Sequence, residues 1–398
     1  DVEHPLCRVL AEMELAGFQV DAGMLRSFGE TLTAAIETLE QRIYSYAGQF
    51  NINSPKQLGE VLFERLGLPS YKKTKTGYST SAEVLEKLRG AHPIVGEVLE
   101  YRQYAKLKST YVDGLLKVIS PDGRVRTSFQ MTVTATGRLS STEPNLQNIP
   151  TRTELGSELR RMFVAGPGQI LVDADYSQIE LRLLAHISGD QAMVDAFRSG
   201  EDFHTVTAAH VFSVPVEEVT PAMRRAAKAV NFGIVYGISP FSLSQDLGVT
   251  VAEAKAYMDA YFHRFPGVKA YMDQVVERAR ADGYVETPMH RRRALPEIKS
   301  SNHNMRSFGE RVALNMPIQG AAADIIKLAM VRVHRQLKEA ALEARLIMQV
   351  HDELIVECPE AEADRVKAIL VREMEGAWPL SVPLIAEAHS GKSWLECH

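Results

Sequence analysis

The sequence is poor in cysteine and has no long apolar run. Its 398 residues include three cysteines, Cys7, Cys358 and Cys397, and none of them stands in a CxxC spacing. Neither a zinc-binding cysteine motif nor a disulfide framework is therefore predicted. No stretch approaches the roughly 20 consecutive apolar residues of a membrane span, and no charged and then apolar leader opens the chain. We expect a soluble, intracellular protein with no membrane partner.

The chain also has little excess charge of either sign. Its 45 Lys and Arg against 50 Asp and Glu give a net charge of -5. That total does not indicate a nucleic-acid binder, but the clustering of Lys and Arg decides such binding. At 398 residues the chain exceeds the roughly 250–300 residues at which one core stops growing, which predicts two or three subdomains. Because the sequence opens without Met, we expect a fragment or a processed product, whose upstream part could carry another activity.

The first 120 residues have the periodicity of amphipathic helices. Ser54 before Pro55 is typical of a helix start, and so is Ser81 with an acid two residues later. Between these two starts lies a basic loop, residues 72–77. Its lysines are Lys72, Lys73 and Lys75. Apolar positions recur at helical spacing over residues 24–46, 54–66, 81–88 and 95–118.

Strands and helices alternate beyond residue 120. Strands are predicted over residues 125–133 and 170–174, and a helix over 178–187 follows the second strand at once. Residues 190–300 return to helical patterns, and a further helix is predicted over 321–340. Neither an internal repeat nor a low-complexity tract is present.

Two acids stand where strands are predicted to end. Asp175 closes the strand over 170–174, and Asp352 lies with Glu353 at the tip of a predicted hairpin between apolar runs. Alone, Asp175 could cap a helix and Asp352 could be a turn residue. On adjacent strands, however, the two carboxylates can hold a pair of Mg2+ ions for phosphoryl transfer, and the backbone carbonyl of Tyr176 can add a ligand.

A helix between these acids carries an unusual stripe. Arg224, Lys228, Phe232 and Tyr236 follow one another at a spacing of four residues, so they lie along one helical face. A ligand with an anionic end and a flat end, such as a nucleoside triphosphate, would suit this face. The alternative is an ordinary amphipathic helix whose cations reach past apolar neighbours to water.

Three segments resemble the polymerase motifs of family A DNA polymerases, the bacterial DNA polymerase I type. They are DYSQIE at 175–180, RRAAKAVNFGIVYG at 224–237 and QVHDE at 349–353. Similarity also covers residues 51–88, 136–150 and 315–324. The resemblance implies an α+β right-hand polymerase fold with an antiparallel-sheet palm, helical fingers and a helical thumb. The implied segments are 1–21 leading into the palm, 22–120 thumb, 121–189 palm, 190–300 fingers and 301–398 palm.

The resemblance also implies roles for the residues around the two acids. Asp175 and Asp352 would be the metal-binding aspartates, with Glu353 an accessory acid beside them. Lys228 would donate a proton to the departing pyrophosphate, and Glu180 would be a steric gate that excludes a 2'-hydroxyl. The remaining nucleotide contacts implied are Arg224 and His204 at the triphosphate, Phe232 at the sugar and base, Tyr236 near the templating position, and Gln178 and Ile179.

Further residues would contact DNA. Their donors would test base-pair geometry without reading sequence, because minor-groove acceptors recur in every Watson-Crick pair. Gln319 could instead be an ordinary helix-start amide, and the loop at 72–77 could be a solvated lysine loop. The residues implied are Arg138, Arg311, Asn315, Gln319, His351, Lys72, Lys73 and Lys75.

Two places depart from the family pattern. His290 stands where a Gly usually precedes three arginines, which could alter a turn and a local DNA contact. Residues 390–398 also depart, and no role is carried onto them. No separate constellation of proofreading carboxylates is found, so no nuclease activity is expected in this chain.

The sequence is identified as a template-directed DNA polymerase that extends a primer 3' end and releases pyrophosphate. The expected partners are primer-template DNA, deoxynucleoside triphosphates and two Mg2+ ions, for which Mn2+ could substitute. A bacterial monomer of the cytoplasm and nucleoid, active in replication and repair, is expected. Two alternatives stay open: a related single-subunit RNA polymerase, disfavoured by Glu180 and Phe232, and an inert DNA-binding protein, disfavoured by the intact acid pair.

Overall fold

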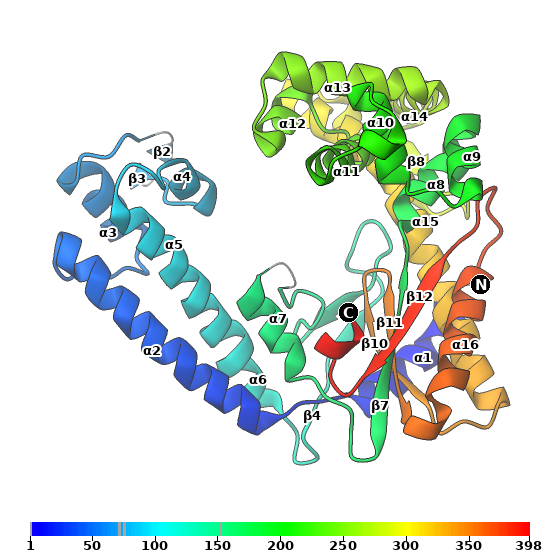
Figure 1. Cartoon of the computed structure of the whole chain (residues 1–398), viewed down its shortest axis with the longest axis horizontal. Coiled ribbons are helices and arrows are strands. Elements are labelled where there is room, and N and C mark those ends of the chain that lie inside the picture. The colour runs from blue at the N-terminus through cyan, green and yellow to red at the C-terminus, as the bar shows by residue number, and fades with distance from the viewer. Residues whose placement is uncertain (1, 71–72, 75–76, 151–152) are drawn as a thin grey trace.

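A four-stranded antiparallel sheet lies at the centre of the molecule (Figure 1). The computed structural model describes residues 2–70, 73–74, 77–150 and 153–398. The order across the sheet is β10-β11-β7-β12. Strand β7, the first of the four along the sequence, therefore lies between β11 and β12. Both Glu353 and Glu387 pair with Asp175, from opposite neighbours. The bounds are β7 Gln169–Tyr176, β10 Arg345–Val350, β11 Glu353–Pro359 and β12 Ala386–Gly391.

Helices pack against one face of this sheet. Successive side chains of a strand point to opposite faces, and on β7 the Tyr176 hydroxyl donates to the Met374 carbonyl on helix α16 at 2.6 Å. Asp173 and Asp175 therefore point to the other face. Helix α16 contacts β7 and β12, α1 contacts β10, and both pack on α15. The bounds are α1 Glu3–Ala16, α15 His303–Glu339, η5 Glu360–Glu362 and α16 Ala363–Glu375.

A long helical arm, residues 22–118, extends to one side (Figure 1). Helix α2 packs against α5, and apolar side chains such as Leu39, Ile43 and Val98 form a separate core between them. The predicted start at Ser54 is confirmed, because its side chain accepts from the Gln57 N–H. The bounds are α2 Ala22–Ala47, α3 Pro55–Gly59, η1 Glu60–Arg65, β2 Lys73–Thr74, β3 Gly77–Tyr78, α4 Ala82–Lys87, α5 Pro93–Lys106, η2 Leu107–Val112 and α6 Asp113–Val118.

The predicted strand over residues 125–133 is wrong as a single element. Two short strands stand there, and they pair with different partners: β4 with β1, and β5 with β6. The pairing with β1 ends at Val125 and the pairing with β6 begins at Ser128, so the predicted strand is interrupted between the two ladders. The bounds are β1 Phe18–Gln19, β4 Arg124–Val125, β5 Ser128–Gln130, β6 Ser140–Thr142 and α7 Glu154–Arg161.

A second helical region, residues 179–299, lies above the sheet in Figure 1. The predicted helices are present, together with a hairpin that the periodicity did not indicate. The bounds are α8 Ile179–Ser188, α9 Gln191–Ser199, α10 Phe203–Phe212, η3 Val216–Glu218, α11 Pro221–Val235, α12 Pro240–Leu247, α13 Val251–Arg264, α14 Pro266–Asp282, β8 Tyr284–Glu286, β9 Arg292–Ala294 and η4 Pro296–Lys299.

Helix α15 begins 18 residues before the predicted start at 321, at His303. Pro317 lies inside it, although an interior proline costs about 3 kcal/mol. Burial offsets that cost, because Met316, Pro317 and Ile318 are all buried. Gly320 is needed for close packing, since a Cβ there would lie 2.6 Å from Thr287 Cγ2.

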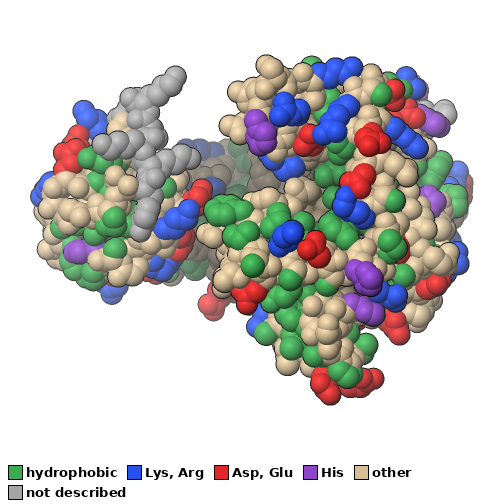
Figure 2. Space-filling model, turned by 90° about the horizontal axis from the view of Figure 1, so that it is seen from above, with side chains coloured by type: hydrophobic (Ala, Val, Ile, Leu, Met, Phe, Trp, Pro, Cys, Tyr) green, Lys and Arg blue, Asp and Glu red, His purple; other side chains and the backbone are tan. Residues whose placement is uncertain are grey.

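The surface carries both signs of charge. Figure 2 shows Lys and Arg interspersed with Asp and Glu over the face seen from above, and the arm stands apart from the rest of the molecule. None of the described helices is both long enough and apolar enough to cross a membrane. The five segment bounds given for palm, thumb and fingers stay a prediction.

Candidate functional site

The hairpin β10-β11 brings Asp352 beside Asp175. Its turn consists of His351, at φ 53°, and Asp352. The Tyr176 N–H donates to the Asp352 carbonyl at 3.2 Å, which fixes the turn against the end of β7. The predicted hairpin is confirmed, with one correction: Glu353 is the first residue of β11 and is 5% exposed, so it lies below the tip.

The two aspartates share a buried site in which the pKa of each carboxyl is raised. Removal from water, and then the charges of Asp352 and Glu353, raise the pKa of Asp175 to about 7. Burial likewise raises the pKa of Asp352 to about 6. Burial and neighbouring acids thus outweigh the nearby positive charges of His398 and Arg138. The pair is therefore suited to a cation supplied from outside the chain.

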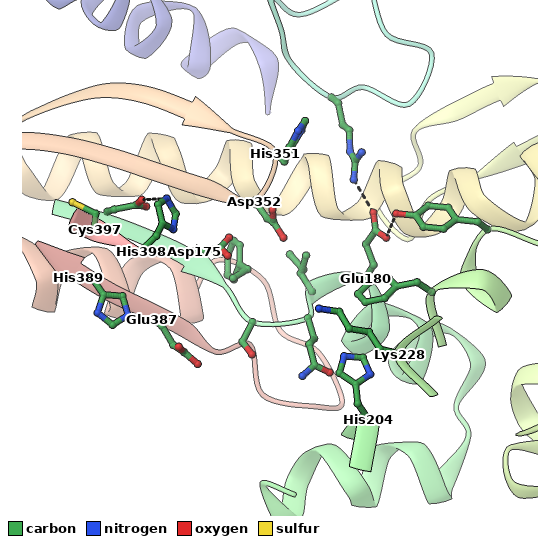
Figure 3. Close-up of a pocket in the computed structure, with 18 of the residues that line it drawn as sticks. Asp175, Glu180, His204, Lys228, His351, Asp352, Glu387, His389, Cys397 and His398 are labelled. Atoms are coloured by element: carbon green, nitrogen blue, oxygen red, sulfur yellow. Dashed lines mark hydrogen bonds and ion pairs between the residues drawn. The ribbon is translucent and has the colours of Figure 1, made fainter. Parts of the chain in front are cut away.

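Helix α8 begins directly after β7 and carries Glu180 toward these acids (Figure 3). Gln178, at φ 56°, makes the turn from strand to helix. The Glu180 carboxylate is 7% exposed and accepts from Arg138 Nη2 at 2.7 Å and from the Tyr236 hydroxyl at 2.8 Å. Held through both oxygens, this side chain has a fixed position.

Helix α11 presents the predicted stripe to the same space. Thr220 caps the helix by accepting from the Met223 N–H, and Tyr236 follows its last residue, Val235. Arg224 donates to Asp202 at 2.5 Å, so an anion bound here would compete with that carboxylate. Lys228 is exposed, whereas Phe232 is half-buried.

One cavity of about 680 Å³ joins these parts (Figure 3). Almost all of the residues predicted around the nucleotide and the metals reach it, from β7, α8, α10, α11 and the hairpin turn. Glu353 is the exception. The predicted residues that line the cavity are Asp175, Tyr176, Gln178, Ile179, Glu180, His204, Arg224, Lys228, Phe232, Tyr236 and Asp352, together with Arg138 and His351.

His204 is the most enclosed of the predicted triphosphate residues. It is 3% exposed, and its Nδ1 lies 2.9 Å from the Asn231 amide nitrogen. Burial lowers the pKa of His204 to about 4. The imidazole is therefore neutral at pH 7 and can give a phosphate a hydrogen bond but not a positive charge.

A second cavity of about 1450 Å³ lies between α11, α12 and α15, and Tyr236 and Asp352 line both cavities. Arg311 lines it as well. Asn315 and Gln319 follow Arg311 at a spacing of four residues, so the three share one helical face. The Asn315 amide nitrogen is buried with no hydrogen-bond partner among the described residues.

Comparisons with known proteins identify the family. A sequence model of DNA polymerase family A matches residues 22–396. The chain belongs to DNA polymerase family A. It is 56% identical over 400 residues to DNA polymerase I of Bacillus caldotenax and 55% identical over 399 residues to that of Bacillus subtilis, covering 100% of this chain. It spans 46% and 45% of the two relatives, about half of their length.

A solved structure of the same family confirms the fold. The POL domain of Pol1 from M. smegmatis, in complex with a DNA primer-template and dNTP, superposes with a TM-score of 0.95 at 48% identity. The match covers 100% of this chain and 70% of that one. The chain therefore has the predicted α+β right-hand polymerase fold.

Part of the predicted DNA surface lies outside the described residues. Lys72 and Lys75 of the basic loop are not described, and Lys73 is described only as backbone in β2. The family departure at His290 occupies a left-handed turn, φ 64°, with its Nδ1 2.7 Å from Glu286 Oε1. The adjacent Arg291 contacts the buried Asp324 at 2.5 Å.

The sequence analysis missed the segment packed behind the acid pair. Trp394 Nε1 donates to Glu353 Oε1 at 2.6 Å, and the Arg160 guanidinium lies 4.1 Å from the centre of the Trp394 ring. His398 and Asp173 lie beside them. Strand alternation places Asp173 on the same face as Asp175, so this residue could have been found. Nothing local indicates where the chain after β12 folds.

Proposed function

We propose that this family A chain is a template-directed DNA polymerase, which adds deoxynucleotides to a primer 3' end and releases pyrophosphate. One observation carries the proposal: a single cavity joins the acid pair Asp175 and Asp352 to the stripe of Arg224, Lys228 and Phe232. An acid pair without the stripe could serve hydrolysis, and the stripe alone could serve binding. Together they suit transfer of a nucleotide from its triphosphate.

The acid pair fits divalent metal ions, as the family implies. Carboxylate oxygens suit Mg2+, and the raised pKa values of Asp175 and Asp352 indicate that added positive charge would be favourable. We propose these residues and the backbone carbonyl of Tyr176 as ligands of two Mg2+ ions, for which Mn2+ could substitute. Bound there, such ions would polarise the phosphoryl oxygens and lower the pKa of the attacking hydroxyl.

The cations of α11 would hold the triphosphate. Arg224 would exchange its 2.5 Å contact with Asp202 for phosphate oxygens. Lys228 is exposed to the cavity, and its ammonium could give the departing pyrophosphate a proton. Neutral His204 would add a hydrogen bond from the neighbouring helix α10, and Phe232 would stack against sugar and base.

The fixed carboxylate of Glu180 would select the sugar. Arg138 and Tyr236 hold both of its oxygens, so it cannot rotate away from an added 2'-hydroxyl at low cost. Gln178 and Ile179, at the start of the same helix, would border the nucleotide. This role favours deoxynucleotides and argues against the RNA polymerase alternative.

We propose the remaining predicted contacts as the DNA surface. The row Arg311, Asn315 and Gln319 would face the minor groove together with Arg138 and His351, where donors find acceptors in every base pair. The sheet layer would be the palm, residues 190–300 the fingers and residues 22–120 the thumb, whose basic loop would grip the duplex backbone. We also propose a bacterial cytoplasmic monomer, associated with the nucleoid and active in replication and repair.

Primer extension tests this function. A labelled DNA primer on a longer DNA template would be incubated with Mg2+ and deoxynucleotides, ribonucleotides, or deoxynucleotides and a chelator. We expect chelator-sensitive growth with deoxynucleotides only. Asp175→Ala or Asp352→Ala should abolish growth while sparing DNA affinity, and Asp259→Ala, at an acid on α13 with a 67% exposed side chain, is the control.

Each other outcome has a meaning. Near-normal extension by the Asp175→Ala or Asp352→Ala variants would refute the metal assignment. Growth with ribonucleotides would favour the RNA polymerase alternative. Tight, salt-sensitive binding to primer ends without any extension would mean that the chain is a DNA-binding protein.

A further inference from the structure

A second group of potential metal ligands lies beside the acid pair, toward the end of the chain. His398 Nε2 lies 3.1 Å from Asp173 Oδ2 and 3.3 Å from Glu353 Oε1. Among the described residues these three side chains alone form such a cluster, with ligand atoms within 4.8 Å of one another. Figure 3 shows His398 at the end of the cavity opposite Lys228 and His204.

Asp173 has no use in the proposed polymerase reaction, and its ion-pair partner is His398, whose Nε2 lies 3.1 Å from Oδ2. Its side chain is 2% exposed, and apart from the neighbouring His398 and Glu353 side chains its carboxylate has no polar partner among the described residues. Buried carboxylates are normally paired, hydrogen-bonded or bound to metal, because an uncompensated buried charge is costly. This carboxylate points at His398 and Glu353, which together offer the remaining ligands of a cation.

We propose that Asp173, Glu353 and His398 form a binding site for a divalent cation of the zinc class, distinct from the Mg2+ site proposed at Asp175 and Asp352. Zinc binds imidazole nitrogen and carboxylate oxygen at roughly 2.0–2.2 Å in tetrahedral geometry, which places neighbouring ligand atoms about 3.3 Å apart. The distances from His398 Nε2 to Asp173 Oδ2, 3.1 Å, and to Glu353 Oε1, 3.3 Å, match that separation of ligand atoms.

The surroundings of the cluster are those of a metal site with one open position. Glu353 Oε1 accepts from Trp394 Nε1 at 2.6 Å, and such outer contacts orient the ligands of a metal. Asp173 and His398 also line the 680 Å³ cavity, which offers a path for the ion and room for water as a fourth ligand. The ion would tie β7 and β11 to the segment after β12.

Arg160 is the competitor for this ion. Its Nη1 lies 2.6 Å from His398 Nε2, and because a guanidinium can only donate, this contact uses the lone pair that a metal would need. Bound zinc would displace Nη1, and the Arg160 side chain could remain stacked on Trp394. Mixed nitrogen and oxygen ligands also favour Zn2+ over Mg2+, which prefers oxygen alone.

Metal titration tests the site without any polymerase assay. The full chain carrying Asp175→Asn and Asp352→Asn, which removes the other acid pair, would be titrated with Zn2+ by calorimetry in excess Mg2+. We expect one Zn2+ per chain. Adding His398→Gln or Asp173→Asn should weaken binding at least tenfold, whereas His389→Gln, in the same cavity on β12, should not.

A spectroscopic readout separates a site from nonspecific binding. Co2+ should give the intense visible absorption of tetrahedral coordination, and His398→Gln should remove it. Arg160→Met should tighten Zn2+ binding, since the competitor is gone, and circular dichroism would show that each variant is folded. No stoichiometric Zn2+, or Zn2+ binding indifferent to His398→Gln, would overturn the proposal. Extension by the unmodified chain is independent of either result.

Discussion

Glu180→Ala tests whether a side chain next to the proposed sugar position excludes ribonucleotides. Glu180 is 7% exposed and is held by Arg138 at 2.7 Å and by Tyr236 at 2.8 Å. A hydrogen bond to a charged group contributes about 1.5–3 kcal/mol. A 2'-hydroxyl in this position would therefore clash with a fixed carboxylate or break one of its two hydrogen bonds.

The expected loss of sugar discrimination can be calculated from the cost of the steric clash or of the broken hydrogen bond. Overpacking a closed site costs about 1–3 kcal/mol, and each 1.36 kcal/mol corresponds to a factor of ten in rate. Discrimination against ribonucleotides should therefore fall about 5- to 150-fold in Glu180→Ala. The change should come from a higher kcat/KM for the ribonucleotide, because the deoxynucleotide has no 2'-hydroxyl to accommodate.

Single-nucleotide extension measures this ratio for each variant. Glu180→Gln is the matched control: it keeps the volume, its one amide oxygen can accept from Arg138, and its NH2 can donate to the Tyr236 hydroxyl oxygen, so it should discriminate almost as the parent does. Tyr236→Phe removes one of the two hydrogen bonds and should have an intermediate effect. Unchanged discrimination in Glu180→Ala would refute the gate. A Gln variant as permissive as the Ala variant would mean that charge, and not bulk, selects the sugar.

Three further changes test other parts of the site. Phe232→Tyr should raise the use of dideoxynucleotides, because the added hydroxyl supplies a polar group where the sugar lacks one; an unchanged ratio of dideoxy to deoxy incorporation would remove Phe232 from the sugar contact. Burial lowers the pKa of His204 from 6.5 to about 4, so the unfolded chain binds this proton first and stability is lost as the pH falls from 6.5 to 4. His204→Gln should reduce that loss by up to about 3 kcal/mol, measured by denaturation at a series of pH values. The same dependence of the free energy of unfolding on pH in the parent and the variant would contradict this prediction. Trp394→Phe removes the donor to buried Glu353 and should cost about 1–3 kcal/mol in urea unfolding. The control is Trp378→Phe, at the second, half-buried tryptophan of the chain, and equal losses of stability in the two variants would contradict a specific effect of the Trp394–Glu353 hydrogen bond.

The predictable part of the site is local in sequence. Asp175 ends a strand and Asp352 lies between two apolar runs, so alternation and a short turn sufficed to place them together. The spacing of Arg224, Lys228 and Phe232 likewise gave a single helical face. These residues required no knowledge of which distant segments pack together, and all five line one cavity.

The elements that were missed depend on distant partners. The strand predicted over residues 125–133 divides because β1 and β6, far apart in the sequence, pair with its two parts. Helix α15 continues through Pro317 because the buried face of the helix offsets the lost hydrogen bond. His398 reaches Asp173 only through the fold of the whole sheet, and no periodicity near either residue indicates the contact.

The neighbouring acids Asp352 and Glu353 show how one turn gives two carboxylates different chemistry. Glu353 accepts from Trp394 and lies 3.9 Å from Arg160 Nη2, so the chain itself supplies its partners. Asp352 opens into the cavity, and its pKa is raised to about 6. Environments that separate two carboxylates in this way assign them different roles. The metal ions of the reaction should therefore bind at Asp352 and Asp175, whereas replacement of Glu353 should act through the segment that holds Trp394 and through the Zn2+ site proposed beside it.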